Sequence, residues 1–135
     1  MDKQIIFDVV LFGIRAQGGP SMNGKGCAYR SAMGRRCAVG MWIANDQYDP
    51  LMEGRTVLSI TRLFPGKLPA WFQDHTGFLQ SLQQAHDSAA DSEDFFPEDF
   101  ERRMRRLAEV TGLRYTHPEV PMPQAEEAYQ EYCTH

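Results

Sequence analysis

Three cysteines and a C-terminal histidine are the first residues of this sequence that could do chemistry. Cys27 and Cys37 stand in the N-terminal half, whereas Cys133 and His135 stand at the other end of the chain. Thiolates and imidazoles are preferred ligands of zinc, which holds them in a tetrahedron. Structural zinc usually takes its ligand pairs from short knuckles, and the spacing of Cys27 and Cys37 does not match one. We therefore predict buried thiols, with no bound metal and no cofactor.

His86 and Asp87 form a second pair that could do chemistry. A carboxylate can orient an imidazole for proton transfer, so the pair could be half of an acid–base or nucleophilic site. Adjacent residues on a helix point about 100° apart, and we therefore expect these two side chains not to face each other. Because His86 lies on or near the apolar stripe of its helix, the sequence favours a hydrogen-bonded histidine at the edge of the core.

A basic group surrounds a glycine-rich stretch, residues 19–26, which we expect to be an exposed, mobile loop. Its members are Lys25, Arg30, Arg35 and Arg36. Phosphates attract such clusters, so a nucleic-acid interface is one interpretation. The group lacks interleaved aromatic residues beyond Tyr29, and its glycines match no phosphate-binding motif. A surface loop is the alternative.

A run of arginines marks a later helix and consists of Arg102, Arg103, Arg105 and Arg106. Three acids, Glu98, Asp99 and Glu101, stand four residues before the first three of these arginines. Side chains at this spacing meet on a helix surface, and the order with the acid first is the favourable one. The pattern is typical of a solvated helix face that pairs its own charges, which we favour here over nucleic-acid binding.

The C-terminal stretch combines carboxylates with tyrosines and has no Lys or Arg after Arg114. Its candidate residues are Glu119, Glu126, Glu127, Tyr129, Glu131 and Tyr132. Carboxylates steer association with a basic protein surface, and tyrosine rings supply buried contact area. We predict a partner-binding surface, with a solvated tail as the alternative.

Composition limits the class of protein. The length of 135 residues suits one domain that folds without disulfides, and hydrophobic residues at 42% indicate a soluble globular chain. We predict a single globular domain over residues 1–113. Residues 114–135 are then an extended, proline-containing segment followed by a short acidic helix that is packed on the domain or tail-like.

Location and charge follow from the same composition. No apolar stretch approaches the roughly 20 residues that cross a bilayer, and the first residues lack the features of a signal peptide. The odd number of cysteines favours reduced thiols, so we predict a cytoplasmic protein without membrane contact. The net charge of −4 is uneven, with about +4 on residues 1–67 and about −8 on residues 68–135. This polarity indicates a charged partner or pairing within the fold.

Helices are the elements that must position these groups, because apolar residues recur at three- and four-residue steps. The predicted helices cover residues 3–17, 76–89, 97–111 and 124–132, with shorter helical pieces over 38–43 and 50–54. Asp2 and Gly18 are suited to begin and end the first helix, and Pro97 and Gly112 to begin and end the third. Residues 57–64 suit either a helix or a strand.

One β-hairpin is expected beside these helices. Residues 27–30 and 35–38 flank a four-residue connection in which Gly34 suits a positive φ angle. Two strands alone are marginally stable in water, so the hairpin must pack on the helices. We therefore predict the α+β class, mainly α: a small helical domain with a short β-hairpin in its N-terminal half.

Several short motifs in this region carry a resemblance. They are Cys27-Ala28-Tyr29-Arg30, Cys37-Ala38-Val39-Gly40, Tyr48 and Met52-Glu53-Gly54. Together they resemble a group of small uncharacterised proteins encoded by tailed phages and prophages, and the likeness extends over most of residues 4–113. The resemblance implies a phage or prophage origin and action inside a bacterial host cell. It implies no reaction.

These observations lead to one leading functional hypothesis. The uneven charge, the lack of a catalytic signature and the resemblance favour a non-enzymatic, phage-type accessory protein. It binds and modulates, through inhibition, a host protein or nucleoprotein complex such as a defence system. The first alternative is a regulatory protein that binds nucleic acid through the basic loop and hairpin. The second is an enzyme or metalloprotein built on the cysteines and His86. The oligomeric state stays open.

Overall fold

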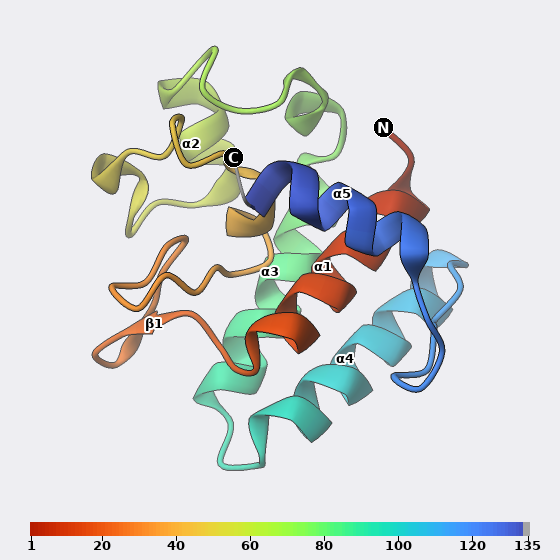
Figure 1. Cartoon of the computed structure of the whole chain (residues 1–135). Coiled ribbons are helices and arrows are strands. Elements are labelled where there is room, and N and C mark those ends of the chain that lie inside the picture. The colour runs from red at the N-terminus through yellow and green to blue at the C-terminus, as the bar shows by residue number, and fades with distance from the viewer. Residues whose placement is uncertain (134–135) are drawn as a thin grey trace.

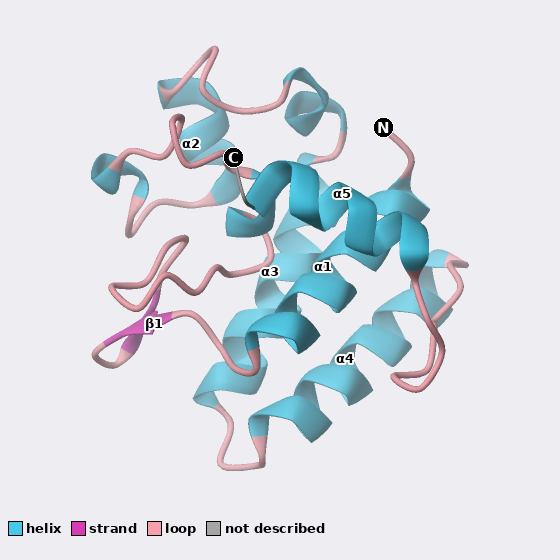
Figure 2. Ribbon diagram, in the orientation of Figure 1, coloured by secondary structure: helices cyan, strands magenta, loops and turns pink. Residues whose placement is uncertain are grey.

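The computed structural model of the chain describes residues 1–133, and the side chains of residues 1–132. Helices dominate this part of the chain, beside one small antiparallel sheet (Figures 1 and 2). The helices are α1 (Lys3–Gln17), α2 (Val57–Leu63), α3 (Thr76–Asp91), α4 (Phe96–Thr111) and α5 (Pro123–Cys133), with short 3₁₀ helices η1 (Gly40–Trp42), η2 (Pro50–Met52) and η3 (Ala70–Asp74). The strands are β1 (Met22–Asn23) and β2 (Gly26–Cys27). The predicted α+β, mainly α class is confirmed.

Helix α1 runs through the middle of the molecule, with α5 lying along one side of it and α3 along another (Figure 1). The side chain of Asp2 accepts a hydrogen bond from the backbone N–H of Gln4 and caps the helix, which ends at Gly18 with φ +80°. Seven residues of α1 are buried, including Phe7, Leu11 and Ile14, so this helix supplies much of the core.

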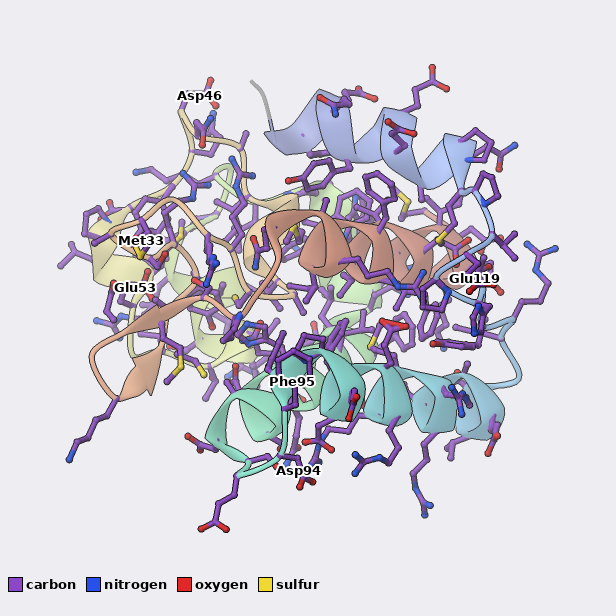
Figure 3. The ribbon with its side chains drawn as sticks, turned by 60° about the horizontal axis from the view of Figure 1, so that its bottom comes forward. Met33, Asp46, Glu53, Asp94, Phe95 and Glu119 are labelled. Carbon is purple, nitrogen blue, oxygen red and sulfur yellow. The ribbon has the colours of Figure 1, made fainter. Side chains whose placement is uncertain are left out.

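Helices α3 and α4 form an antiparallel pair that closes the other side of the core (Figure 1). Their turn carries Asp94 and Phe95, both at the surface in Figure 3. Phe100 and Met104 of α4 are buried, as the apolar stripe predicted, and Gly112 ends the helix with φ +71°. The pair matters for the site because the opposite, polar side of α3 faces the hairpin.

The β-hairpin lies earlier in the chain than the sequence predicted. The strands are β1 and β2, which pair Met22 with Cys27, and the predicted pairing of residues 27–30 with 35–38 is reduced to one isolated bridge between Arg30 and Arg36. Much of the glycine-rich stretch expected to be a loop is therefore this hairpin. The cause is that the Glu53 carboxylate accepts the backbone N–H groups of residues 29 and 30, so those donors need no strand partner.

The proline-containing segment after α4 leads into α5, which packs along α1 and against η1. The rings that hold it are Tyr129, edge-on to Phe12 at 5.5 Å between centroids, and Tyr132, edge-on to Trp42 at 4.8 Å. Of the two arrangements that the sequence allowed for this stretch, the structure has the packed one. Within residues 1–133, none of the helices has the length and apolar character needed to span a bilayer.

Candidate functional site

A cavity of about 580 Å³ lies between the polar side of α3, strand β2 and residues 53–57, and we name it the α3 pocket. Its volume is in the range of small-ligand sites. The side chains that matter most are those of Cys27, Tyr29, Glu53, Asp87 and Asp91. The pocket therefore brings together one predicted thiol, one predicted carboxylate, Tyr29 and Glu53 of the sequence motifs, and Asp91, which no motif contains.

Glu53 forms the wall of this pocket and ties three motif segments together. Its carboxylate accepts the backbone N–H groups of Tyr29 at 2.8 Å and Arg30 at 3.1 Å, and the hydroxyl of Tyr48 at 2.6 Å. The hydroxyl of Tyr29 in turn donates to the carbonyl of Arg55. These three motif segments thus form one hydrogen-bonded unit, in which the glutamate has a structural role.

Gly40 and Cys37 belong to the same unit. The backbone N–H of Gly40 lies 3.4 Å from the sulfur of Cys37, which is fully buried. The Cα of Gly40 faces the carbonyl of Tyr29 so closely that an added Cβ would lie 2.1 Å from that oxygen. A side chain of any size is therefore excluded at position 40, which explains the glycine of this motif.

His86 is a buried, hydrogen-bonded histidine. The backbone N–H of Ser21 donates to its Nε2 at 3.0 Å, which leaves the ring proton on Nδ1, where it donates to Asp87 at 2.9 Å. The prediction that His86 and Asp87 do not face each other is therefore wrong. The Cβ directions do diverge, but Nδ1 lies near the backbone, where the short side chain of its neighbour reaches it. Both ring nitrogens are engaged, so the imidazole is not free to act as a base.

The two described thiols are held in their protonated form. The pKa of Cys27 is raised to about 12, chiefly by burial and also by the charge of Asp87, its hydrogen bond with Asp87 and the charge of Asp91. Burial also raises the pKa of Cys37 to about 12. Because the thiolate is the reactive form, neither cysteine is a nucleophile at neutral pH.

We expect Cys27 to react very slowly with iodoacetamide although it borders the α3 pocket. At pH 8 its rate of alkylation should be about 100-fold or more below that of a cysteine in an unstructured peptide, since the thiolate fraction falls with the raised pKa. Mass spectrometry of the peptide containing Cys27 measures this rate. Asp87→Asn with Asp91→Asn should speed the reaction, because two negative charges are removed, and an alkylation rate equal to that of the peptide would contradict this view.

Cys27, His86 and Asp87 offer three ligand atoms within 4.8 Å of one another, but the arrangement does not suit a metal ion. A metal on Nδ1 of His86 would move the ring proton to Nε2, where it would face the N–H of Ser21. The zinc set weighed from the sequence is also not assembled in the described residues, because Cys37 is not part of this cluster. The side chain of Cys133 and all of His135 lie outside the described part of the chain.

The basic group separates into structural and exposed members. Arg30 lies 4.9 Å above the ring of Tyr48 and donates to the carbonyl of Ile43. Arg36 is only 5% exposed and donates to the side chain of Asn45 and to the carbonyls of Ile43 and Tyr132. Lys25 is exposed at the tip of the hairpin and Arg35 is half-buried. The nucleic-acid alternative remains a prediction, and these two residues are the members still open to a phosphate.

The arginines of α4 pair partly as predicted. Asp99 forms ion pairs with Arg103 and Arg102, both at 3.0 Å. The prediction that Glu101 pairs with Arg105 is wrong, because the carboxylate of Glu101 binds the guanidinium of Arg15 on α1 instead. The spacing of residues within one helix could not predict an ion pair between two helices. It fastens α4 to the central helix.

The acids and tyrosines of α5 and of the segment before it point in different directions. The carboxylate residues Glu119, Glu126, Glu127 and Glu131 are exposed. Tyr129 and Tyr132, in contrast, pack inward on α1 and η1, so they hold the helix in place and are not a free contact surface. The predicted site is therefore reduced to its acids.

Sequence reasoning missed most of the α3 pocket. Gln84, Asp87 and Asp91 line it from three turns of α3, and Glu53 lines it from a distant loop. The signal available in the sequence was the polar stripe on α3 opposite Leu79 and Leu82. Without the position of the hairpin, this stripe cannot be told from an ordinary solvent-exposed helix face. Fold and pocket together define a small, mainly helical α+β protein with a polar cavity. No family model matches the chain, and no curated protein or solved structure matches it.

Proposed function

We propose that this protein is a non-enzymatic, phage-type accessory protein that binds and inhibits a host macromolecular complex, such as a defence system, in the bacterial cytoplasm. One observation carries the proposal. Within the described side chains, Glu126, Glu127 and Glu131 on the outer face of α5 are exposed and form no ion pair or hydrogen bond. Such a face is complementary to a basic protein surface.

The packing of α5 against the rest of the fold supports this proposal. Ala125 is buried, the two tyrosines pack inward, and the guanidinium of Arg36 donates to the carbonyl of Tyr132 at 3.3 Å. The outer acids therefore lie on a helix that is already fixed by packing. Binding of a partner then costs little conformational entropy for ordering these residues. On α4, by contrast, Asp99 is already neutralised by arginines.

The chemistry of the α3 pocket supports the non-enzymatic part. Its thiol is held protonated, and the imidazole of His86 is engaged at both nitrogens. Groups that are committed to hydrogen bonds within the fold are poor candidates for nucleophile or base.

The test is quantitative affinity capture from nuclease-treated bacterial lysate. The bait is the wild-type protein or the triple variant Glu126→Gln, Glu127→Gln, Glu131→Gln. A matched control, Glu93→Gln, Glu98→Gln, Glu109→Gln, removes the same charge from exposed residues outside α5. We expect a stoichiometric protein partner with wild type and control, reduced about tenfold or more with the α5 variant, because opposite charges hold the complex.

Two results would count against the proposal. One is the absence of any stoichiometric partner of the wild-type protein. The other is equal recovery of the partner by the α5 variant and the control, since the acids would then play no part. Addition of salt to the wash should weaken a genuine complex of this kind, because salt screens exposed charges.

A further inference from the structure

A second hollow borders the acidic face at the start of α5. It is a groove of about 450 Å³ between α1 and the proline-containing segment, lined chiefly by Phe12, Val120, Met122 and the prolines between residues 118 and 123. Glu119 marks this segment in Figure 3, where it lies on the chain that leads into α5. We name this hollow the α5 groove.

The floor and one wall of the α5 groove are apolar. Val120 is 52% exposed, and Phe12 and Met122 are half-buried, so apolar surface faces water at this place. Prolines fix the backbone φ angle of the segment that forms the wall, which limits its rearrangement on binding. The groove is therefore preformed for an apolar side chain, whose burial there stabilises a complex.

The rim of the α5 groove is acidic. Glu119 and Glu126 line it, and within the described residues neither side chain forms an ion pair. Arg15 also lines the groove, but its guanidinium is bound by the carboxylate of Glu101 and donates to the carbonyl of Thr116 at 2.8 Å. The charges left for a ligand are therefore negative.

We propose that the α5 groove receives a segment of the partner protein in which a large apolar side chain is flanked by basic residues. The apolar side chain enters between Phe12, Val120 and Met122, and the basic residues meet Glu119 and Glu126. This inference rests on the proposed function, because Glu126 belongs to the acidic face of α5. It adds the chemistry that the partner must present.

Three synthetic pentapeptides with blocked ends test this chemistry. The first has a central tryptophan between two lysines on each side, the second replaces the tryptophan by glycine, and the third replaces the lysines by glutamates. Titration followed by NMR measures affinity and maps the site on the protein. We expect the first peptide to shift the amide signals of Phe12 and Val120 and the other two to bind about tenfold or more weakly, since each lacks one of the two interactions.

Variants of the protein make the test specific. Val120→Asn replaces an apolar side chain of the groove by an uncharged polar one and should weaken the first peptide about tenfold, whereas Val110→Asn changes a valine on α4 that is 75% exposed and lies outside the groove. Glu119→Gln with Glu126→Gln should weaken it severalfold, and Glu98→Gln with Glu109→Gln should not. The inference is wrong if Val120→Asn binds the first peptide as tightly as wild type, or if the shifted signals lie elsewhere.

The lysate capture separates failure of the groove from failure of the proposed function. If Val120→Asn retains the partner and the triple α5 variant loses it, the groove inference is wrong and the proposed function stands. If Val120→Asn loses the partner and the triple α5 variant retains it, the acidic face does not carry the proposed function and the apolar part of the groove inference stands. If neither variant changes capture, both are wrong. Loss of the partner with both variants supports both.

Discussion

Gly40→Ala will strongly destabilise the protein. The new Cβ would lie 2.1 Å from the carbonyl oxygen of Tyr29, well inside van der Waals contact. That oxygen belongs to a backbone held in place by Glu53, so it cannot move away without breaking the hydrogen bonds of the motif unit. Overpacking a well-packed core usually costs about 1–3 kcal/mol, and a clash with fixed backbone should exceed this range. We expect a loss of about 4 kcal/mol or more, against total stabilities of about 5–15 kcal/mol for such domains.

Urea unfolding followed by circular dichroism measures the effect, and Gly77→Ala is the matched control. An added Cβ at Gly77 meets nothing within 4 Å, and this glycine lies in the first turn of α3. Alanine is a better helix former than glycine by up to about 1 kcal/mol, so the control should be unchanged or slightly more stable. Equal unfolding midpoints for Gly40→Ala and wild type would show that the packing of position 40 on Tyr29 is wrong.

Arg36→Met will lower the free energy of unfolding by about 2 kcal/mol. Methionine fills much of the space of the arginine stem but offers no donor to the carbonyls of Ile43 and Tyr132 or to Asn45. The carbonyl of Ile43 and the side chain of Asn45 keep hydrogen bonds from Arg30, so the loss falls mainly on the carbonyl of Tyr132. A buried acceptor that loses its donor costs about 1–3 kcal/mol when no water replaces it. The control Arg106→Met changes an exposed arginine for which the described residues show no ion pair, and it should cost less than about 0.5 kcal/mol.

The same variant separates two interpretations of the basic group. If Arg36 holds α5 and residues 43–45 together, Arg36→Met lowers the unfolding midpoint and any effect on nucleic-acid binding follows from that loss. If Arg36→Met keeps the stability of wild type but abolishes a mobility shift with DNA or RNA, the structural role is wrong and the nucleic-acid alternative gains support. Unfolding curves and mobility shifts of the same preparation decide between these outcomes.

The helices were predictable because their signals are local. Asp2 and Gly18 bound α1 within one residue of its observed ends, and the stripe that contains Phe100 and Met104 identified the buried side of α4. These features depend on residues three or four positions apart. Side-chain periodicity and capping are therefore enough to place them.

The loss of strand pairing at residues 27–30 and the partner of Glu101 were not predictable, because the groups that decide them are distant in sequence. The donors of Tyr29 and Arg30 are satisfied by Glu53, more than twenty residues away, which removes the need for a strand at positions 29 and 30. Arg15 pairs with Glu101, which is 86 residues away in sequence. The i to i+4 rule therefore assigned that acid to the wrong arginine. The candidate site had the same difficulty. Its acids could be identified from composition, but whether the tyrosines beside them face inward depends on where α1 and η1 lie.

The packing of α5 along α1 has a consequence for synthesis on the ribosome. The two helices stand at opposite ends of the described chain, yet they are among the most extensively packed pairs of elements. While the chain is being translated, Phe12 and Trp42 have no rings from α5 to cover them. Folding that starts from the N-terminus as the nascent chain emerges can therefore not finish the core until α5 has been released. Until then, this apolar surface is available to chaperones.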